Sequence, residues 1–387
     1  MTEQPGVQAE EGTDRIGRRD LMRWAGLAGT AAALAPSLAQ AGSPAKVAAV
    51  FDRRHVGRTH VLPSTPQTVR VGNMDPAVKP VLEIESGDVV HYPDTWVNWA
   101  NEAKYQMPTA EREKIPRRYP NGPTSLVGPV AIKGAEPGDV IECRMIRLKP
   151  IDWGWNSAIP GMGALPTDFS EPYLHYFRFD KARRFTEFSP GVRIALAPIQ
   201  GVIAAQPAGP DPVSALRAGA YGGCVQLPDL VEGTSLFIAA EVPGANIWTG
   251  DSHAVQGDGV VNQTGIETAM EDLRIQYILH KGAKIGTPIA ETPTHWIVAG
   301  YADTLDGAVA ATLRHFIDWL SGATGMSRLD VYALASLSGS VRLTQYANQI
   351  GGRYKAVSEK AVHIRLPKNL FDAGLQGRIA QSLRPRV

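Results

Sequence analysis

The sequence has little cysteine and almost no excess of either charge. Its 387 residues include two cysteines, Cys143 and Cys224, and 39 lysines and arginines stand against 38 aspartates and glutamates. Two cysteines exclude a disulfide framework, although one bridge between them is possible, and neither has neighbouring histidines spaced for a zinc cluster. A net charge near zero gives no electrostatic signature for nucleic acid or an anionic membrane. We therefore expect small molecules as partners.

Long apolar runs and common catalytic motifs are also missing. Beyond the N-terminus no run approaches the roughly 18 apolar residues that a membrane helix needs, so no span is expected once a signal has been cleaved. The chain has no HExxH, no Walker loop and no GxGxxG after a strand. The GDS triplet at 250–252 lacks the downstream Asp-x-x-His of one esterase group, and Ala254 is not the second glycine of a G-x-S-x-G elbow.

The N-terminus has the parts of an export signal. Arg18 and Arg19 form a twin-arginine pair, a modest apolar stretch follows over 24–38, and Ala39-Gln40-Ala41 supplies small residues for cleavage. A twin arginine before a weakly hydrophobic, alanine-rich stretch is typical of the Tat pathway. Residues 1–41 are therefore predicted to be a Tat-type signal peptide, and the mature protein is predicted to be periplasmic.

The next two parts, 42–160 and 161–300, are predicted to be β-rich. Short alternating runs are separated by Gly and Pro throughout. In one of them Ile141, Cys143 and Met145 fall on one face and Glu142 and Arg144 on the other, as a half-buried strand requires. So many short strands favour a sandwich or barrel. The charged segment 101–123 has no periodicity and reads as a long loop or a loop with one helical turn, either a lid or a surface insertion.

The last part, 301–387, changes character to α/β. Within 306–321 one apolar stripe recurs at helical spacing. The stripe consists of Val309, Leu313, Phe316, Ile317 and Leu320. Ser327 and Asp330 predict a capped start for a second helix over 328–337, and 362–367 predicts a closing strand.

The densest chemistry lies in GDSHAVQGDG at 250–259. Asp251 and His253 are two apart, so an extended backbone places both side chains on one face, where oxygen and nitrogen ligands suit zinc or a similar divalent ion. Asp258 could add a third ligand if its flanking glycines let the chain fold back. An open coordination position on such an ion can hold a water molecule, and the ion lowers the pKa of that water to about 7. The plainer alternative is a polar turn in which aspartates accept from backbone N–H groups.

The context of that stretch resembles the acetamidase/formamidase family. The segments that carry the resemblance are VKPVLEIESGDVV, LVGPVAIKGAEPGDVIE, DWGWN, YGG, VPGANIWTGDSHAVQGDG, ETPTHW, LDVYALASLSGSVRLTQ and VHIRLPKNLF, in order from about His60 to Phe371. The resemblance implies a mainly β (α+β) fold: a jelly-roll-like β-sandwich, a smaller β-barrel part and an α/β C-terminal portion, often as a homo-oligomer. It also implies hydrolysis of short linear amides, such as formamide or acetamide, to a carboxylate and ammonia.

The resemblance also implies roles for individual residues. The matching positions are Asp251, His253, Gln256, Asp258, Thr264 and Glu267, with Asp75 and Asp94 as weaker candidates. Asp251, His253 and Asp258 would hold a divalent metal, most simply zinc, or orient water. Glu267, Asp258 and His253 are the expected catalytic groups, with Glu267 taking a proton from water and later protonating the departing amine. Substrate contacts are expected from Gln256, Asn262, Thr264 and Asp94.

Several polar positions depart from the family pattern. Arg70 in TVRVG and Thr124 in TSLVGP replace histidines, and Cys224 and Gln226 in GGCVQ replace an amide and a carboxylate. In VVNQT, Val260, Asn262 and Gln263 replace a carboxylate, a thiol and a glycine. These changes remove groups that could ligate a metal or move protons. We therefore expect an altered substrate range.

A second hypothesis is a non-catalytic periplasmic protein that binds a small polar ligand or a sugar on the same scaffold. Its stacking platform would come from Trp96, Trp99, Trp153 and Trp155, which could equally be ordinary β-protein core. His280, His295 and His363 have no assigned role, because a lone histidine near a strand end is usually a structural group.

Overall fold

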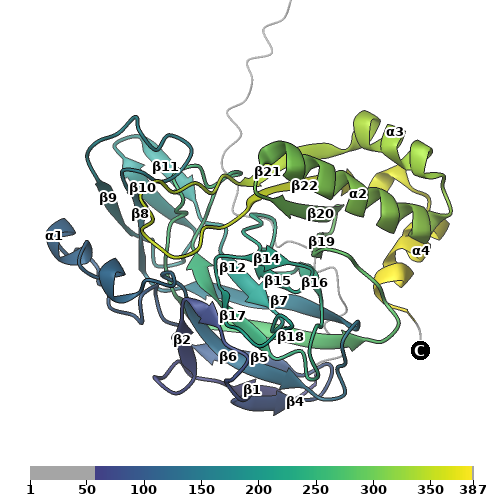
Figure 1. The fold of residues 1–387 in the computed structure, drawn as a ribbon, viewed down its shortest axis with the longest axis horizontal. Coiled ribbons are helices and arrows are strands. Elements are labelled where there is room, and N and C mark those ends of the chain that lie inside the picture. The colour runs from purple at the N-terminus through teal and green to yellow at the C-terminus, as the bar shows by residue number, and fades with distance from the viewer. Residues whose placement is uncertain (1–56, 386–387) are drawn as a thin grey trace, which may run out of the picture. The chain divides into compact units, whose positions relative to one another are not determined.

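Strands dominate the computed structural model, which describes residues 57–385 (Figure 1). The predicted signal peptide, residues 1–41, lies outside the described residues. Among the described residues no helix is both long enough and apolar enough to cross a bilayer. The segment 101–123 contains the short helix α1 (Thr109–Arg112) and the 3-10 turn η2 (Pro116–Arg118). The expectation of a loop with about one helical turn is thus confirmed.

The larger sheet has nine strands. Its order is β1 (Thr59–Val61), β5 (Val89–Pro93), β18 (Met270–His280), β7 (Val140–Pro150), β16 (Ser235–Ala239), β19 (Ile289–Glu291), β20 (His295–Ala302), β22 (Lys360–Pro367) and β21 (Ser340–Gln345). These strands come from all three predicted parts of the chain. The apolar face expected for β7 is confirmed, since Ile141, Cys143 and Met145 are fully buried, but the expectation of a half-buried strand is wrong at Glu142. The other face is covered as well: Glu142 is buried against Arg384 beyond the last helix, at 2.6 Å.

The smaller main sheet has seven strands and carries the site. Its order is β14 (Ala218–Gly219), β15 (Gly222–Cys224), β12 (Ile199–Ala204), β17 (Ile247–His253), β6 (Ser125–Ile132) and β2 (Val69–Val71), with β4 (Leu82–Ile84) pairing β6 in parallel. Three further pairs are β8 (Trp153–Ala158) with β9 (Tyr173–Arg178), β10 (Phe185–Ser189) with β11 (Val192–Ala195), and β3 (Asn73–Met74) with β13 (Val213–Ser214).

The two main sheets pack face to face around one apolar core. Val90 and Met145 of the nine-stranded sheet belong to the same buried cluster as Val127, Ile203 and Ile247 of the seven-stranded sheet. Burial of apolar side chains between two sheets is how a sandwich is stabilised. The mainly β fold is therefore confirmed. Where a smaller barrel was expected, the sheets of the described residues stay open.

Three helices form the predicted C-terminal layer, beside the strands β20, β21 and β22 (Figure 1). They are α2 (Leu305–Thr324), α3 (Arg328–Ser338) and α4 (Ala373–Leu383), with the 3-10 turn η3 (Lys368–Leu370) before the last. The stripe of α2 faces this sheet, with Phe316 and Leu320 fully buried. Ser327 caps α3 by accepting from the Asp330 N–H, as the sequence predicts.

The buried histidine of β22 gives a prediction about pH. Burial lowers the pKa of His363 from 6.5 to about 4, so the unfolded chain takes up a proton at a higher pH than the folded protein does. This contribution to stability is complete above the unfolded pKa and is lost as the pH falls through the interval between the two values. From about pH 7 to about pH 5 the free energy of unfolding should fall by roughly 2 kcal/mol more in the wild type than in His363→Leu. Denaturant unfolding at both pH values measures this, and an equal fall in both proteins would contradict it.

Candidate functional site

The stretch GDSHAVQGDG begins in β17, the strand between β12 and β6 in the seven-stranded sheet. Asp251 and His253 are both on this strand, and the pair expected to share one face does so: His253 Nε2 lies 3.5 Å from Asp251 Oδ2. Asp251 has a φ of 59°, in the left-handed region, and the pairing with β12 is interrupted there. Gly201 is opposite, where a side chain would meet the Asp251 backbone oxygen at 2.8 Å.

Glu267 joins this pair from a separate segment. An isolated bridge links its backbone to His253 and another links it to Trp155 of β8, so the segment is held between two strands. Its Oε1 lies 3.0 Å from His253 Nε2. Asp251, His253 and Glu267 are all buried, and each offers a ligand atom within 4.8 Å of the others. This arrangement is a triad of two carboxylates and one imidazole.

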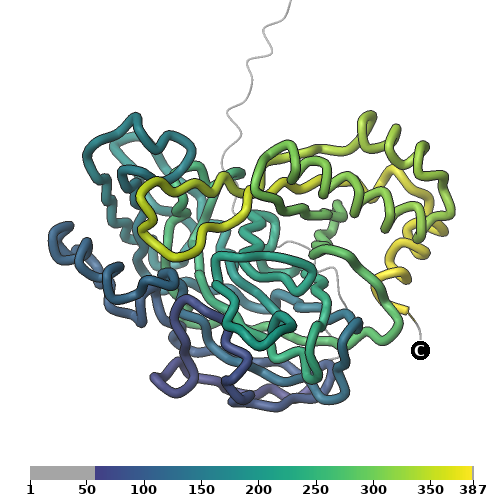
Figure 2. The backbone as a smooth tube through the Cα atoms, viewed as in Figure 1, coloured from purple at the N-terminus to yellow at the C-terminus, as the bar shows by residue number. Residues whose placement is uncertain are grey.

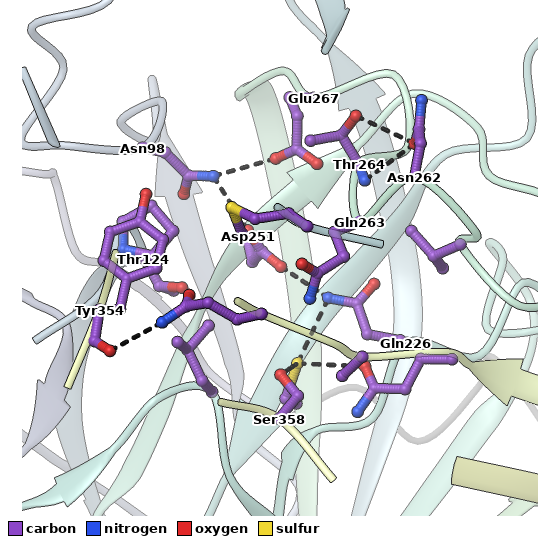
Figure 3. A pocket seen from close by; sticks show the side chains of 18 of the residues that line it. Asn98, Thr124, Gln226, Asp251, Asn262, Gln263, Thr264, Glu267, Tyr354 and Ser358 are labelled. Carbon is purple, nitrogen blue, oxygen red and sulfur yellow. Dashed lines mark hydrogen bonds between the residues drawn. The ribbon is translucent and has the colours of Figure 1, made fainter. Parts of the chain in front are cut away.

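Hydrogen-bond donors hold the two carboxylates of the triad, and Figure 3 shows the Asn98 amide between Asp251 and Glu267. Asn98 Nδ2 donates to both, at 3.1 Å to Asp251 Oδ1 and 2.9 Å to Glu267 Oε2. Gln226 Nε2 donates to Asp251 Oδ2 at 2.7 Å, and the Gly265 N–H donates to Glu267 Oε1 at 3.2 Å. Buried carboxylates require such donors, because unpaired charge in a dry interior is very costly. The donors also fix the direction in which each carboxylate points.

Gln256 determines the orientation of the imidazole. Its Nε2 donates to the Gln226 backbone oxygen at 2.6 Å, which leaves its side-chain oxygen to accept from His253 Nδ1 at 2.7 Å. With the proton on Nδ1, Nε2 faces the carboxylates of Asp251 and Glu267, and within the described part of the chain it has no well-directed hydrogen bond. Three acceptor atoms thus converge, and either a proton or a metal cation must balance them.

The electrostatics follow from this convergence. Burial disfavours the charged imidazole, but the carboxylates of Glu267 and Asp251 outweigh burial and raise the pKa of His253 to about 10. Burial likewise raises the pKa of Glu267, opposed by the neighbouring His253. Without another cation, the site would therefore carry a proton on His253 at neutral pH.

The triad lines a cavity of about 110 Å³. One wall comes from Gln345 at the end of β21 and from the segment between β21 and β22, which is traced as a long yellow loop in Figure 2 and contributes Gln349, Tyr354 and Ser358. An aromatic wall is made by Trp99 and Trp155, whose rings stack with centroids 6.3 Å apart. The cavity has room for a few waters or one small organic molecule.

The positions that depart from the family pattern gather in this cavity. Thr124, Cys224, Gln226 and Val260 all line it, as do Asn262 and Gln263. Burial raises the pKa of the Cys224 thiol to about 12, so it remains protonated at neutral pH. Arg70 is different: its guanidinium donates to the backbone oxygens of Pro66, Gln67 and Val69. The substitution at Arg70 therefore does not alter the cavity lining.

Not all the predicted site residues meet. Asn262 and Thr264 line the cavity, and Gln256 supports His253 from behind. Asp258 is outside the triad, because its half-exposed carboxylate pairs with Arg342 of β21 at 3.2 Å. The structure therefore places Asp258 apart from Asp251 and His253, and brings Glu267 beside them instead.

The weaker candidates also lie elsewhere. Asp94 is exposed, and Asp75 accepts from the Ala77 N–H in a local turn; neither lines the cavity. Of the four tryptophans proposed as a platform, only Trp99 and Trp155 line the cavity, while Trp153 packs behind Trp155 and Trp96 packs against the main core.

Residues without an assigned role have structural contacts. His280 pairs with Glu142, His295 with Thr294 and His363 with Thr344. The two cysteines are not bonded to one another, since Cys143 is in the core and Cys224 is at the cavity.

Asn98 is the central residue that sequence reasoning missed. The signal for it in the sequence is its position in the tryptophan-rich stretch DTWVNWA, a pattern that predicts stacking rather than hydrogen bonding. Its amide spans both carboxylates of the triad, so this stretch contributes a polar support as well as the aromatic wall.

The chain is similar in sequence and in fold to known proteins. The family model described as Acetamidase/Formamidase family matches residues 65–212. An acetamidase from Bacillus halodurans has the same fold, with a TM-score of 0.71 and 25% identity over 81% of this chain and 98% of that one. The resemblance to the acetamidase/formamidase family is confirmed.

Two further relatives of this family match the chain. An acetamidase from Yersinia enterocolitica gives a TM-score of 0.71 at 26% identity, covering 84% of this chain and 96% of that one. A presumed formamidase from Schizosaccharomyces pombe is 25% identical in an alignment of 195 residues that covers 36% of this chain. The match spans 48% of that relative, about half of its length.

The contact at Gly201 gives a prediction for the triad's support. A side chain there would meet the Gln226 Nε2 at 2.8 Å and the Asp251 Oδ2 at 2.9 Å, so Gly201→Ala must displace the Asp251 carboxylate. We expect a loss of about 1–3 kcal/mol in the free energy of unfolding. Gly257→Ala, in open space on the same stretch, is the matched control and should change stability by less than about 0.5 kcal/mol. Equal effects in a denaturant titration would contradict the close packing behind Asp251.

Proposed function

We propose that this protein is an amidase-like hydrolase that cleaves the C–N bond of a small linear amide, giving a carboxylate and ammonia. The family resemblance supports the reaction class. The observation that carries the proposal is the buried triad of Asp251, His253 and Glu267, set in a cavity with room for a small amide and a water. Amide hydrolysis needs a polarised carbonyl, an activated water and a protonated leaving amine, and such a triad can contribute to each.

The triad's donor set fits a divalent cation. Two carboxylate oxygens and an imidazole nitrogen are the ligand types that zinc prefers in catalytic sites, and His253 Nε2 is buried without a directed hydrogen bond. Asp251, His253 and Glu267 would hold the ion, and Gln256 would orient the imidazole from outside. When bound, such an ion supplies Lewis acidity and lowers the pKa of water.

The chain's own residues provide the proton transfers. Glu267 is fixed by Asn98 and by the Gly265 N–H, and burial raises its pKa, which makes its carboxylate a better proton acceptor than that of an exposed glutamate. We assign to Glu267 the removal of a proton from the attacking water and its delivery to the departing nitrogen. Asn98, which also donates to Asp251, is a positioning residue for this step.

The residues of the cavity lining that depart from the family pattern favour binding of a neutral amide group. Gln226 Oε1 is buried without a hydrogen-bond partner among the described residues and can accept an N–H from the substrate. Thr124 and Asn262 add a hydroxyl and an amide where the family pattern has an imidazole and a thiol, and Gln263 adds an amide where it has a glycine. Cys224 is neutral, so it serves as a small lining residue rather than as a nucleophile. The substrate range should therefore differ from that of formamide and acetamide hydrolases.

A binding protein is the second candidate, favoured by the stacked Trp99 and Trp155 in the cavity wall. A planar amide or a sugar ring could pack on these indoles without being cleaved. Export through the Tat pathway, periplasmic location, homo-oligomerisation and the domain boundaries at 160/161 and 300/301 also remain proposals.

Ammonia release from a panel of small linear amides tests the two candidates. Wild-type protein should release ammonia, and Glu267→Gln, which keeps the side-chain shape, should reduce kcat by at least about a hundredfold with an unchanged melting temperature. Asp258→Asn is the control and should retain activity, because Asp258 pairs with Arg342 outside the cavity. Release of no ammonia from any amide, with saturable amide binding, would replace the hydrolase by the binding protein.

A further inference from the structure

A buried arginine stands directly behind the aromatic wall. Arg112, at the end of α1, is 6% exposed, and its guanidinium lies 4.2 Å from the ring centre of Trp155 and 5.0 Å from that of Trp99. Among residues 57–385 neither Nη1 nor Nη2 has a well-directed hydrogen bond, although the guanidinium also interacts with the side chain of Tyr176. Cation–π contacts offset part of the cost of burying this charge, but they do not satisfy the in-plane N–H groups. A buried guanidinium without a well-directed hydrogen bond at either Nη atom calls for an acceptor.

Arg112 lines a small chamber of about 40 Å³ next to the main cavity. Trp99, Ser157 and Ile159 line both spaces, so the chamber adjoins the cavity that holds the triad. Arg353, from the loop between β21 and β22, lines the chamber but not the main cavity. Two arginines far apart in the sequence therefore meet at one small space.

The chamber has an excess of positive charge. Glu113 is the one acidic residue in its lining, and it is exposed. Within residues 57–385, neither Arg112 nor Arg353 forms a salt bridge with it or with any other carboxylate. A guanidinium presents its donors in a planar fork that matches the two oxygens of a carboxylate. The volume suits a group of a few atoms rather than a large anion.

We propose that this chamber is an anion subsite that binds a carboxylate group between Arg112 and Arg353. The proposal deepens the proposed function, on which it rests for the origin of the ligand. That carboxylate has two possible sources: the acid released by hydrolysis, or a second, distal carboxylate on the substrate, as in the monoamide of a dicarboxylic acid. Both sources share the chemistry that the two guanidinium groups recognise.

Thermal unfolding with increasing sodium acetate, against sodium chloride at equal ionic strength, tests the subsite without requiring turnover. Acetate should raise the melting temperature of the wild type in a saturable way. Arg353→Gln and Arg112→Met should each weaken acetate binding by about tenfold or more, the loss expected for a charged hydrogen bond. Lys114→Gln, an exposed cation on the same segment, should bind acetate like the wild type. Arg353 is half-buried, so its variant remains informative if Arg112→Met fails to fold.

The absence of a saturable acetate effect, or an effect of equal strength in Arg353→Gln and the wild type, would overturn the subsite. Hydrolysis of succinamate and of neutral butyramide then identifies the source. If Arg353→Gln lowers kcat/KM for succinamate at least about tenfold more than it lowers kcat/KM for butyramide, the subsite binds the distal carboxylate of the substrate. If Arg353→Gln changes kcat/KM equally for both substrates and abolishes inhibition by acetate, the subsite binds the acid that hydrolysis releases. Acetate binding without hydrolysis of any amide would support the subsite and contradict the proposed function. Amide hydrolysis without acetate binding would contradict only the subsite.

Discussion

Two buried carboxylates facing one imidazole are the constraint on which the rest of this site depends. Asp251, Glu267 and His253 bring acceptor atoms together in a place that water does not screen, so positive charge must accompany them. Asn98 and Gln226 reduce the free-energy cost of burying the two carboxylates, because their side-chain amides donate hydrogen bonds to them. A proton on His253 or a divalent cation can balance the negative charge that remains. A site that requires a cation in this way is also suited to activating water.

The scaffold places these groups by non-local contacts. The interrupted pairing at Asp251 is possible because Gly201 leaves space on the neighbouring strand, and Glu267 is held by backbone bridges to two strands of different sheets. Local propensity contributes little to either feature. The site is therefore coupled to the packing of the whole sandwich, and a small displacement of one strand would separate the triad.

Sequence reasoning reached the parts of the molecule that local periodicity determines. The strand containing Ile141, the amphipathic helix α2 and the Ser327 cap are each encoded within a few residues, and Asp251 and His253 lie close enough in sequence for strand geometry to align them. The role of Asp258 could not be foreseen, because its partner Arg342 comes from a distant strand. Glu267 was expected as a base from the resemblance alone, and its place beside His253 appears only once the sheets are assembled.

The cavity keeps the triad but has exchanged much of its polar lining. Thr124, Gln226 and Val260 are neutral, and Val260 has a φ of 41°, a strained value for a β-branched residue. Strain of this kind persists only where the surroundings enforce it. Behind the aromatic wall, Arg112 adds a guanidinium, a group that is absent from the lining of the cavity. These features support the proposal of an altered substrate range on the family scaffold.

Calorimetric titration of zinc into metal-free protein tests the central claim, that three buried side chains converge as one cation site. The account predicts about one ion bound per chain in the wild type and in Asp258→Asn, and binding at least about tenfold weaker in Asp251→Asn. Equal binding by all three proteins, or a loss in Asp258→Asn as large as that in Asp251→Asn, would contradict it.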